Sequence, residues 1–226
     1  MQTLGLHSGT LIGVILSMCI VMSLCVQIDA HFGMVSKMHM HPSNMTTHRS
    51  SGKFVGMNQL LLTIALDWRV KLWDTGVLSR PTVGATKLKA GAASTGLPTL
   101  STGLLFEFVN PSYDYVSDIQ WSPMHPAIFA CITSNNTLYI WNVMVSSTEP
   151  TDTVVIPSTL ESPGSTDSTV ACTQLEWNPN GKQIYVGNSA GVVYTVQLKD
   201  SVVAHRPADD SKFEALINQK RKTGGM

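Results

Sequence analysis

The chain has 226 residues, which suits one large domain or two small ones, and its hydrophobic content of 43% is ample for a folded core. Fifteen basic and fifteen acidic side chains cancel, so the chain has no net field that would draw it to nucleic acid or to an anionic membrane surface. We therefore expect a globular protein that does not bind nucleic acid.

Residues 1–30 form an apolar N-terminal segment that differs from the rest of the chain. No charged side chain occurs between residues 11 and 28, and the first basic residue is Lys37. Such a run is typical of a signal sequence or a marginal membrane span, but the missing basic flank and the poor cleavage site at residues 28–30 argue against both. Three interpretations stay open: a targeting or anchoring segment, a pair of buried strands, or an aberrant start from an alternative exon or a mispredicted gene model.

Three similar units follow, and they become visible when Pro42, Pro123 and Pro179 are placed in register. Alternate apolar residues before each proline indicate a first strand. Apolar runs after the prolines predict second strands over residues 61–66, 128–133 and 184–187, and third strands over residues 68–73, 137–141 and 192–196. The chain therefore contains three blade-like units, residues 31–74, 106–145 and 170–200.

The third strand of the first unit has a clear alternation of charged and apolar residues from Arg69 to Trp73. Successive side chains of a strand point to opposite faces, so Val70 and Leu72 face one way and Arg69, Lys71 and Trp73 face the other. This pattern predicts a half-buried strand.

Residues 75–105 and 146–169 separate the units and are rich in Ser, Thr, Gly and Pro. They lack the hydrophobic periodicity of a helix or a strand. We predict that both are loop insertions or disordered tracts between blades.

Residues 201–226 form a C-terminal tail in which we predict a short helix. Acidic residues at its start and basic residues at its end suit the helix dipole. Phe213, Leu216, Ile217 and Lys220 recur at helical spacing, so this stripe is expected to pack on the rim of the blades.

The three units resemble WD repeats, whose four-stranded blades build β-propellers. The resemblance rests on the segments KLWD and YIWN at the ends of two third strands and on the W-S-P and W-N-P turns after two first strands. The spacing exceeds the usual period of about 40–45 residues, and the two insertions account for the excess.

Within this class the chain resembles the cytoplasmic dynein intermediate chain family. Residues 106–143, which include DYVSDIQWSPMHPAIFAC, match the family's D-Y-V-x-D-x-x-W-S-P-x-H-P-A-x-F-A-C segment at its fixed positions. LLLTIALDWRVKLWD and GKQIYVGNSAGVVYTV are similar to two further family segments, so the resemblance covers residues 31–222 outside the insertions. The family's long N-terminal region and early blades have no counterpart here, and Val196 replaces the aromatic residue that ends a typical unit.

The resemblance implies an all-β fold, namely a partial WD-repeat β-propeller of three to four blades with a short C-terminal helix. It also implies a non-catalytic scaffold subunit of the cytoplasmic dynein motor complex, located in the cytoplasm on microtubules. Its partners would be the dynein heavy chain and other dynein subunits, and it would support the microtubule-based transport of cargo.

Two other functions stay open. One is a WD-repeat interaction module outside dynein. The other is a membrane-anchored or secreted β protein directed by residues 11–28, and glycosylation of the sequons at Asn44 or Asn135 would favour it.

Tryptophans are the main candidate site residues. Four are expected to be structural core of the blades: Trp73, Trp121, Trp141 and Trp177. The expected partner contact consists of Trp68, Arg69 and Lys71, because Trp68 begins its strand beside a turn. Three acids are expected to bond turn amides or hydroxyls: Asp67, Asp74 and Asp118.

We predict no catalytic residue, cofactor or metal. His39 and His41 share one strand face, with His31 and His48 nearby, which is an arrangement that metal sites also show. The corresponding positions of the other units are Gln, Ser, Glu and Asn, which favours a solvated face. The four cysteines lack zinc-site or disulfide spacing and are interpreted as small buried residues. No nucleophile with a supporting base and no phosphate-binding loop is evident.

Overall fold

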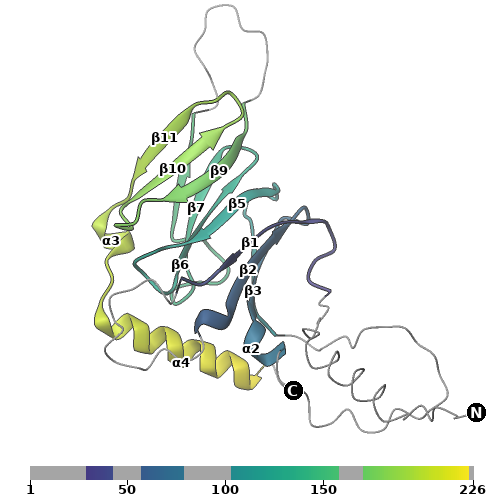
Figure 1. The fold of residues 1–226 in the computed structure, drawn as a ribbon, viewed down its shortest axis with the longest axis vertical. Coiled ribbons are helices and arrows are strands. Elements are labelled where there is room, and N and C mark those ends of the chain that lie inside the picture. The colour runs from purple at the N-terminus through teal and green to yellow at the C-terminus, as the bar shows by residue number, and fades with distance from the viewer. Residues whose placement is uncertain (1–28, 43–56, 79–102, 158–169, 224–226) are drawn as a thin grey trace, which may run out of the picture.

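The computed structural model describes residues 29–42, 57–78, 103–157 and 170–223. Residues 1–28, residues 43–56 with Asn44 and His48, and much of both predicted insertions lie outside the described residues, so expectations placed on them stay predictions. Within the described part, the strands form three antiparallel sheets that stand beside one long helix (Figure 1). The prediction of an all-β fold of blade-like units with a C-terminal helix is confirmed.

The first sheet has four strands, in the order β1 (Val35–Met40), β2 (Leu60–Ala65), β3 (Arg69–Asp74) and β4 (Leu104–Val109). A short 3-10 helix, η1 (Met57–Gln59), precedes β2, and a one-turn helix, α2 (Thr75–Leu78), follows β3. The second sheet consists of β5 (Val116–Trp121), β6 (Ile128–Thr133), β7 (Thr137–Asn142) and β8 (Asp152–Val155). The third sheet consists of β9 (Cys172–Trp177), β10 (Gln183–Asn188) and β11 (Val193–Gln197).

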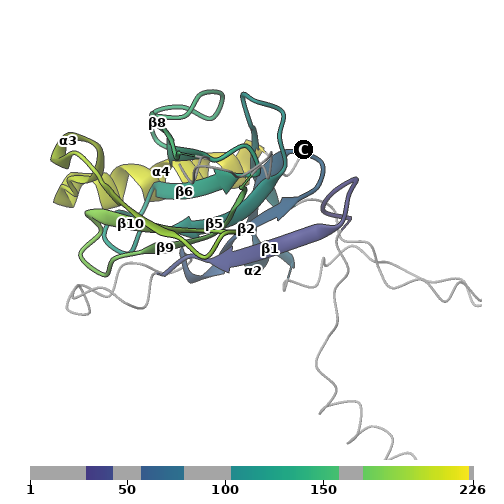
Figure 2. The ribbon, with the colours of Figure 1, turned by 90° about the horizontal axis from the view of Figure 1, so that it is seen from above.

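The sheets stack in chain order through their first strands, because β5 contacts both β1 and β9. Seen from above, β1 and β9 lie toward one side of the molecule and β8 lies toward the other (Figure 2). This is the arrangement of neighbouring propeller blades, whose first strands are the innermost ones.

The fourth strands β4 and β8 were not predicted. β8 lies within residues 146–169, which were predicted to be a loop, and β4 begins in the other tract and takes in residues 106–109, which were assigned to the second unit. Instead, β4 pairs with β3 of the first sheet, with Arg69 opposite Val109, and β8 pairs with β7 of the second sheet. Both are outer strands. The chain reaches β4 only after a long connection, and β8 is a strand of four residues whose pattern is too short to detect.

The alternation in β3 predicted a half-buried strand, and this prediction is wrong. Residues 70–74 are all buried because β3 lies between β2 and β4, and the segment that precedes β1 also contacts it. The Lys71 ammonium group donates a hydrogen bond of 2.7 Å to the carbonyl oxygen of Ala30 in that segment. The side chain of Lys71 therefore faces protein and not solvent.

Two apolar clusters hold the sheets together. The first lies between the first and second sheets and includes Phe108, Phe129 and Trp141. The second lies between the second and third sheets and includes Ile132, Ile140 and Leu175. The strand β6 contributes to both clusters, and all six of its residues are buried, as its continuous apolar sequence predicts.

The second sheet packs on the third sheet with one of its faces, and the corresponding face of the third sheet has a different composition. On the second sheet this face carries buried apolar residues: Ile128, Ala130, Ile132, Leu138 and Ile140. The strand register places the following residues at the corresponding positions of the third sheet: Gln183, Tyr185, Gly187, Val193 and Thr195. This face of the third sheet is therefore more polar and more exposed than its counterpart on the second sheet.

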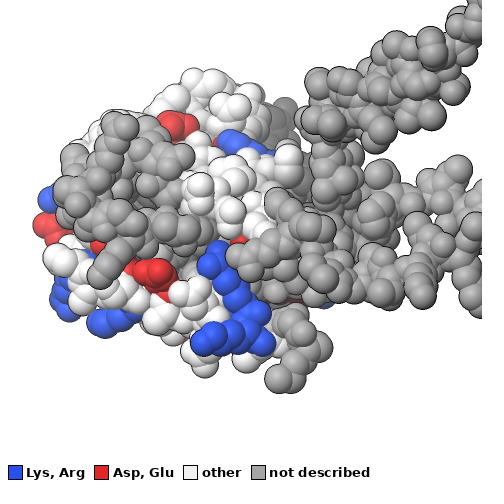
Figure 3. Space-filling view, turned by 60° about the horizontal axis from the view of Figure 1, so that its bottom comes forward, with Lys and Arg blue, Asp and Glu red and all other residues white. Residues whose placement is uncertain are grey.

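The C-terminal helices are α3 (Asp200–Val203) and α4 (Pro207–Thr223). As predicted from its apolar stripe, α4 packs on the sheets through Phe213 and Ile217, which are buried in the first cluster. The Lys220 ammonium group lies 4.8 Å from the centre of the Phe106 ring of β4. The side of the molecule that carries α4 displays both basic and acidic groups (Figure 3). None of the helices in the described residues has the length and apolar character needed to cross a membrane.

Candidate functional site

Trp73 is buried and belongs to a hydrogen-bonded network within the first sheet. Its indole Nε1 donates to the Thr63 hydroxyl at 2.9 Å, and this oxygen lies 2.7 Å from Nε2 of His31. Nδ1 of His31 lies 3.0 Å from the Asp67 carboxylate. The His31 ring therefore bridges the Thr63 hydroxyl and the Asp67 carboxylate, and Thr63 joins it to the Trp73 indole.

The Asp67 carboxylate fixes the turn between β2 and β3. It accepts hydrogen bonds from the backbone amides of Arg69 and Phe32, at 3.3 and 3.2 Å, in addition to its contact with His31. Burial tends to raise the pKa of Asp67, but the hydrogen bond and charge of His31, together with the two amides, lower it on balance. Asp67 therefore bonds turn amides, as expected, and also anchors the segment before β1.

Asp118 is buried and connects all three sheets. It lies 2.5 Å from the Lys37 ammonium group of β1 and accepts hydrogen bonds from the amides of Ile119 in β5 and Leu175 in β9, at 2.6 and 2.9 Å. Asp74 accepts from the amide of Gly76 and from the Arg221 guanidinium group of α4. These two acids therefore fasten separate elements to one another, which their sequence positions did not reveal.

The other three predicted core tryptophans are also buried. Trp141 of β7 packs edge-on against Phe108 of the first sheet, with ring centres 5.2 Å apart. Trp121 of β5 packs against Phe213 of α4. Nε1 of Trp177 donates to the carbonyl oxygen of Gln120 at 3.3 Å, which joins the third sheet to the second.

His39 and His41 do not occupy a solvated face, so that interpretation is wrong. Both face the second sheet, where Nδ1 of His39 accepts from the Trp121 amide at 3.2 Å and Nε2 of His41 bonds the Pro126 carbonyl oxygen at 2.8 Å. Burial lowers the pKa of His41 to about 4, against a smaller opposing effect of the Pro126 carbonyl. No group of three His, Cys, Asp or Glu side chains in the described segments is arranged to hold a metal ion.

Of the three residues predicted to contact a partner, only two are accessible. Trp68 is 50% exposed, and the Arg69 guanidinium group, 40% exposed, pairs with Glu107 across the sheet. Lys71 is only 7% exposed and is held by the Ala30 carbonyl oxygen, with Phe32 above its ammonium group. We therefore correct the predicted contact by removing Lys71 from it.

Trp68 has an unusual backbone conformation. Its φ is +62°, in the left-handed region, and the turns of the second and third sheets place Asn136 and Gly191 at the same point with φ of +63° and +78°. Asn and Gly adopt this conformation readily, whereas a bulky tryptophan does so at a cost. The strained turn holds the indole at the surface of the first sheet.

Other exposed aromatic residues occur in the two segments whose backbone amides bond this turn, residues 29–34 and 110–115, and we call the set the aromatic rim: Phe32, Trp68, Tyr113 and Tyr115. Tyr113 also has a left-handed φ, of +54°, and is 67% exposed. The Asn110 amide donates to the Trp68 carbonyl oxygen, which brings the loop of Tyr113 next to the turn. Sequence reasoning missed all but Trp68, since neighbouring aromatic residues in the same segments are buried and nothing in the pattern separates them.

The fold and this rim define a WD-repeat-like β protein that presents an aromatic surface. Sequence comparison then confirms the resemblance to dynein intermediate chains. The cytoplasmic dynein 1 intermediate chain of Drosophila melanogaster is 26% identical over 160 residues, which is 71% of this chain and 19% of that protein. The 70 kDa intermediate chain of the flagellar outer arm dynein of Chlamydomonas reinhardtii is 24% identical over 106 residues, or 47% of this chain and 17% of that protein.

This chain therefore spans less than a fifth of the length of these relatives. A search of protein-family models found no match. Among solved structures, the WD40 domain of Toxoplasma gondii coronin aligns with a TM-score of 0.49 and 14% identity, covering 77% of this chain and 34% of that one.

Proposed function

We propose that this protein is a non-catalytic scaffold subunit of the cytoplasmic dynein motor complex. Its WD-repeat sheets would bind the dynein heavy chain and so support microtubule-based transport of cargo in the cytoplasm. The observation that carries this proposal is the similarity to the D. melanogaster intermediate chain over 71% of the chain.

The structure supports a scaffold through the way its surface is built. Buried ion pairs and hydrogen bonds, such as those of Asp118, fix the sheets relative to one another. The aromatic rim then offers rigid side chains that lose little conformational entropy on binding, which is the usual character of an interface anchor. Other dynein subunits would be further partners of the same assembly.

A pull-down with the dynein heavy-chain tail tests the proposal. We expect the tagged chain to retain the tail, and Trp68→Asn to weaken retention while its far-UV circular dichroism spectrum stays unchanged. Asn is the matched replacement because Asn136 already occupies this left-handed position in the second sheet. If the folded wild-type chain fails to retain the tail, assembly into dynein has to be abandoned.

A WD-repeat interaction module outside dynein is the second candidate, and the aromatic rim favours it equally. Cross-linking of the chain in cells, followed by mass spectrometry, separates the two candidates by the partners recovered. The third possibility, a membrane-anchored or secreted protein, depends on residues 11–28 outside the described part, and glycosylation at exposed Asn135 would support it.

A further inference from the structure

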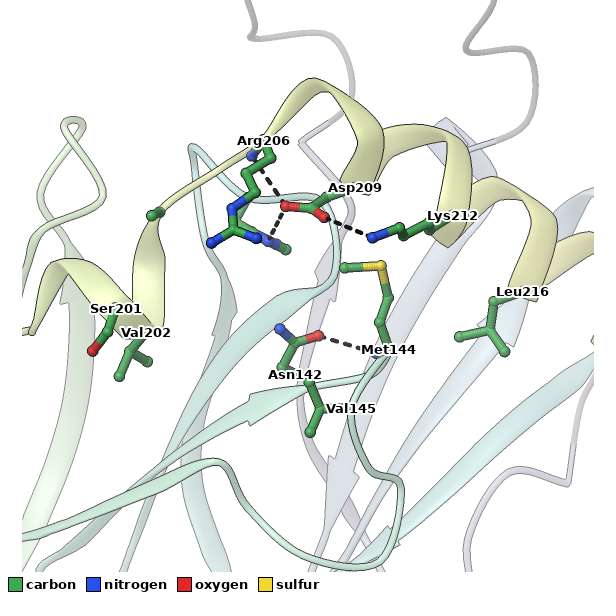
Figure 4. A pocket seen from close by; sticks show the side chains of 11 residues that line it. Asn142, Met144, Val145, Ser201, Val202, Arg206, Asp209, Lys212 and Leu216 are labelled. Atoms are coloured by element: carbon green, nitrogen blue, oxygen red, sulfur yellow. Dashed lines mark hydrogen bonds and ion pairs between the residues drawn. The ribbon is translucent and has the colours of Figure 1, made fainter.

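A groove separate from the aromatic rim lies between the C-terminal helices and the turn that follows β7. Its volume is about 540 Å³, within the range of about 300–1,000 Å³ that is typical of ligand sites. Figure 4 shows α4 on one side of the groove, α3 on another, and Met144 between them. This groove does not depend on the assignment to dynein.

The lining of the groove is both polar and apolar, and several of its apolar side chains pack on the core. Met144 and Leu216 are partly buried and pack on the first core cluster, and Val202 packs in the same way on the second. Val145 is 70% exposed at the edge. The groove therefore presents apolar side chains that the fold has already fixed in place, so an occupant would meet a preformed surface.

The charges around the groove are unequal. Among the described residues that line it, Asp209 is the one carboxylate, and it is already engaged by the Arg206 backbone amide at 3.0 Å and by His125 at 3.7 Å. Lys212 lies 3.9 Å from the same carboxylate but remains 69% exposed. Among the described residues, no carboxylate pairs with the exposed Arg206 guanidinium group. Two cations are thus accessible at the mouth, and the single anion is satisfied.

We propose that this groove binds a peptide segment of a protein partner in which leucine-like side chains are flanked by carboxylates. The apolar side chains would contact Met144, Val145 and Leu216, while the carboxylates would pair with Arg206 and Lys212. When a peptide segment binds in this way, the apolar contacts supply affinity and the two cations select acidic segments over basic ones.

The test uses the full chain and three fluorescein-labelled peptides, EELLEELLEE, KKLLKKLLKK and EESSEESSEE, in anisotropy titrations at low salt. We expect the acidic leucine peptide to bind at least about tenfold more tightly than either of the others. Binding of the basic peptide with equal or greater affinity, or equal binding of the serine peptide, would overturn the proposal.

Matched variants locate the binding. Val145→Glu and Lys212→Glu are expected to weaken binding of the acidic leucine peptide about fivefold or more, since each places a carboxylate at the groove. Val193→Glu and Lys222→Glu make the same chemical changes at exposed residues outside the groove and are expected to leave binding within about twofold. All four positions are exposed, and thermal unfolding verifies that the variants fold. If the two pairs behave alike, the groove is not the binding site.

Discussion

The substitution Trp141→Ala should unfold the contact between the first two sheets. Trp141 is 1% exposed, and its ring packs against Phe108 of the first sheet and stacks on Phe129. A tryptophan buries about 150–250 Å², which at about 25 cal/mol per Å² corresponds to about 4–6 kcal/mol, and measured losses for such truncations are about 3–5 kcal/mol. Since a whole domain is stable by only about 5–15 kcal/mol, this is a large part of the total.

Trp68→Asn is the matched control, because Trp68 is half exposed. Half the burial corresponds to about 2–3 kcal/mol, and relief of the left-handed strain returns about 1 kcal/mol, so a net loss of about 1–2 kcal/mol is expected. Urea unfolding followed by far-UV circular dichroism measures both losses without relying on tryptophan fluorescence. If Trp141→Ala costs no more than Trp68→Asn, the assignment of Trp141 to the inter-sheet core is wrong.

Three further predictions concern buried polar groups. The pKa of His41 is about 4 in the folded protein, below its ordinary value of 6.5, so the free energy of unfolding should fall by about 2 kcal/mol as the pH falls from 7 to 5. His41→Phe should flatten the dependence of stability on pH over this range. An unchanged slope would contradict the assignment. Asp118→Asn should destabilise the protein by about 2–3 kcal/mol, which is less than the about 3–5 kcal/mol of a fully buried pair because Lys37 is partly exposed. A double-mutant cycle with Lys37→Met should show a coupling above about 0.5 kcal/mol between these two residues. Burial raises the pKa of the Cys131 thiol to about 12, so iodoacetamide at pH 8 should label it only as fast as the protein unfolds, and mass spectrometry that finds rapid labelling in the folded state would refute this.

The positions of the first three strands of each sheet followed from the sequence alone. The prolines at 42, 123 and 179 and the apolar alternation around them located the first three strands of each sheet, and the structure agrees within one residue. Local alternation carries this information because side chains of a strand point to opposite faces, whatever the strand later packs against. The stripe of α4 was readable for the same reason, since helical spacing alone places Phe213 and Ile217 on one side.

Other features were decided only by tertiary contacts. The outer strands β4 and β8 form because the chain returns to an edge with unpaired backbone groups, and no local pattern encodes that return. Burial of Lys71 likewise depends on a carbonyl oxygen from residue 30, far away in sequence. The groove exists because α3 and α4 meet the end of the second sheet, so its apolar side chains and its two accessible cations come together only in the folded chain.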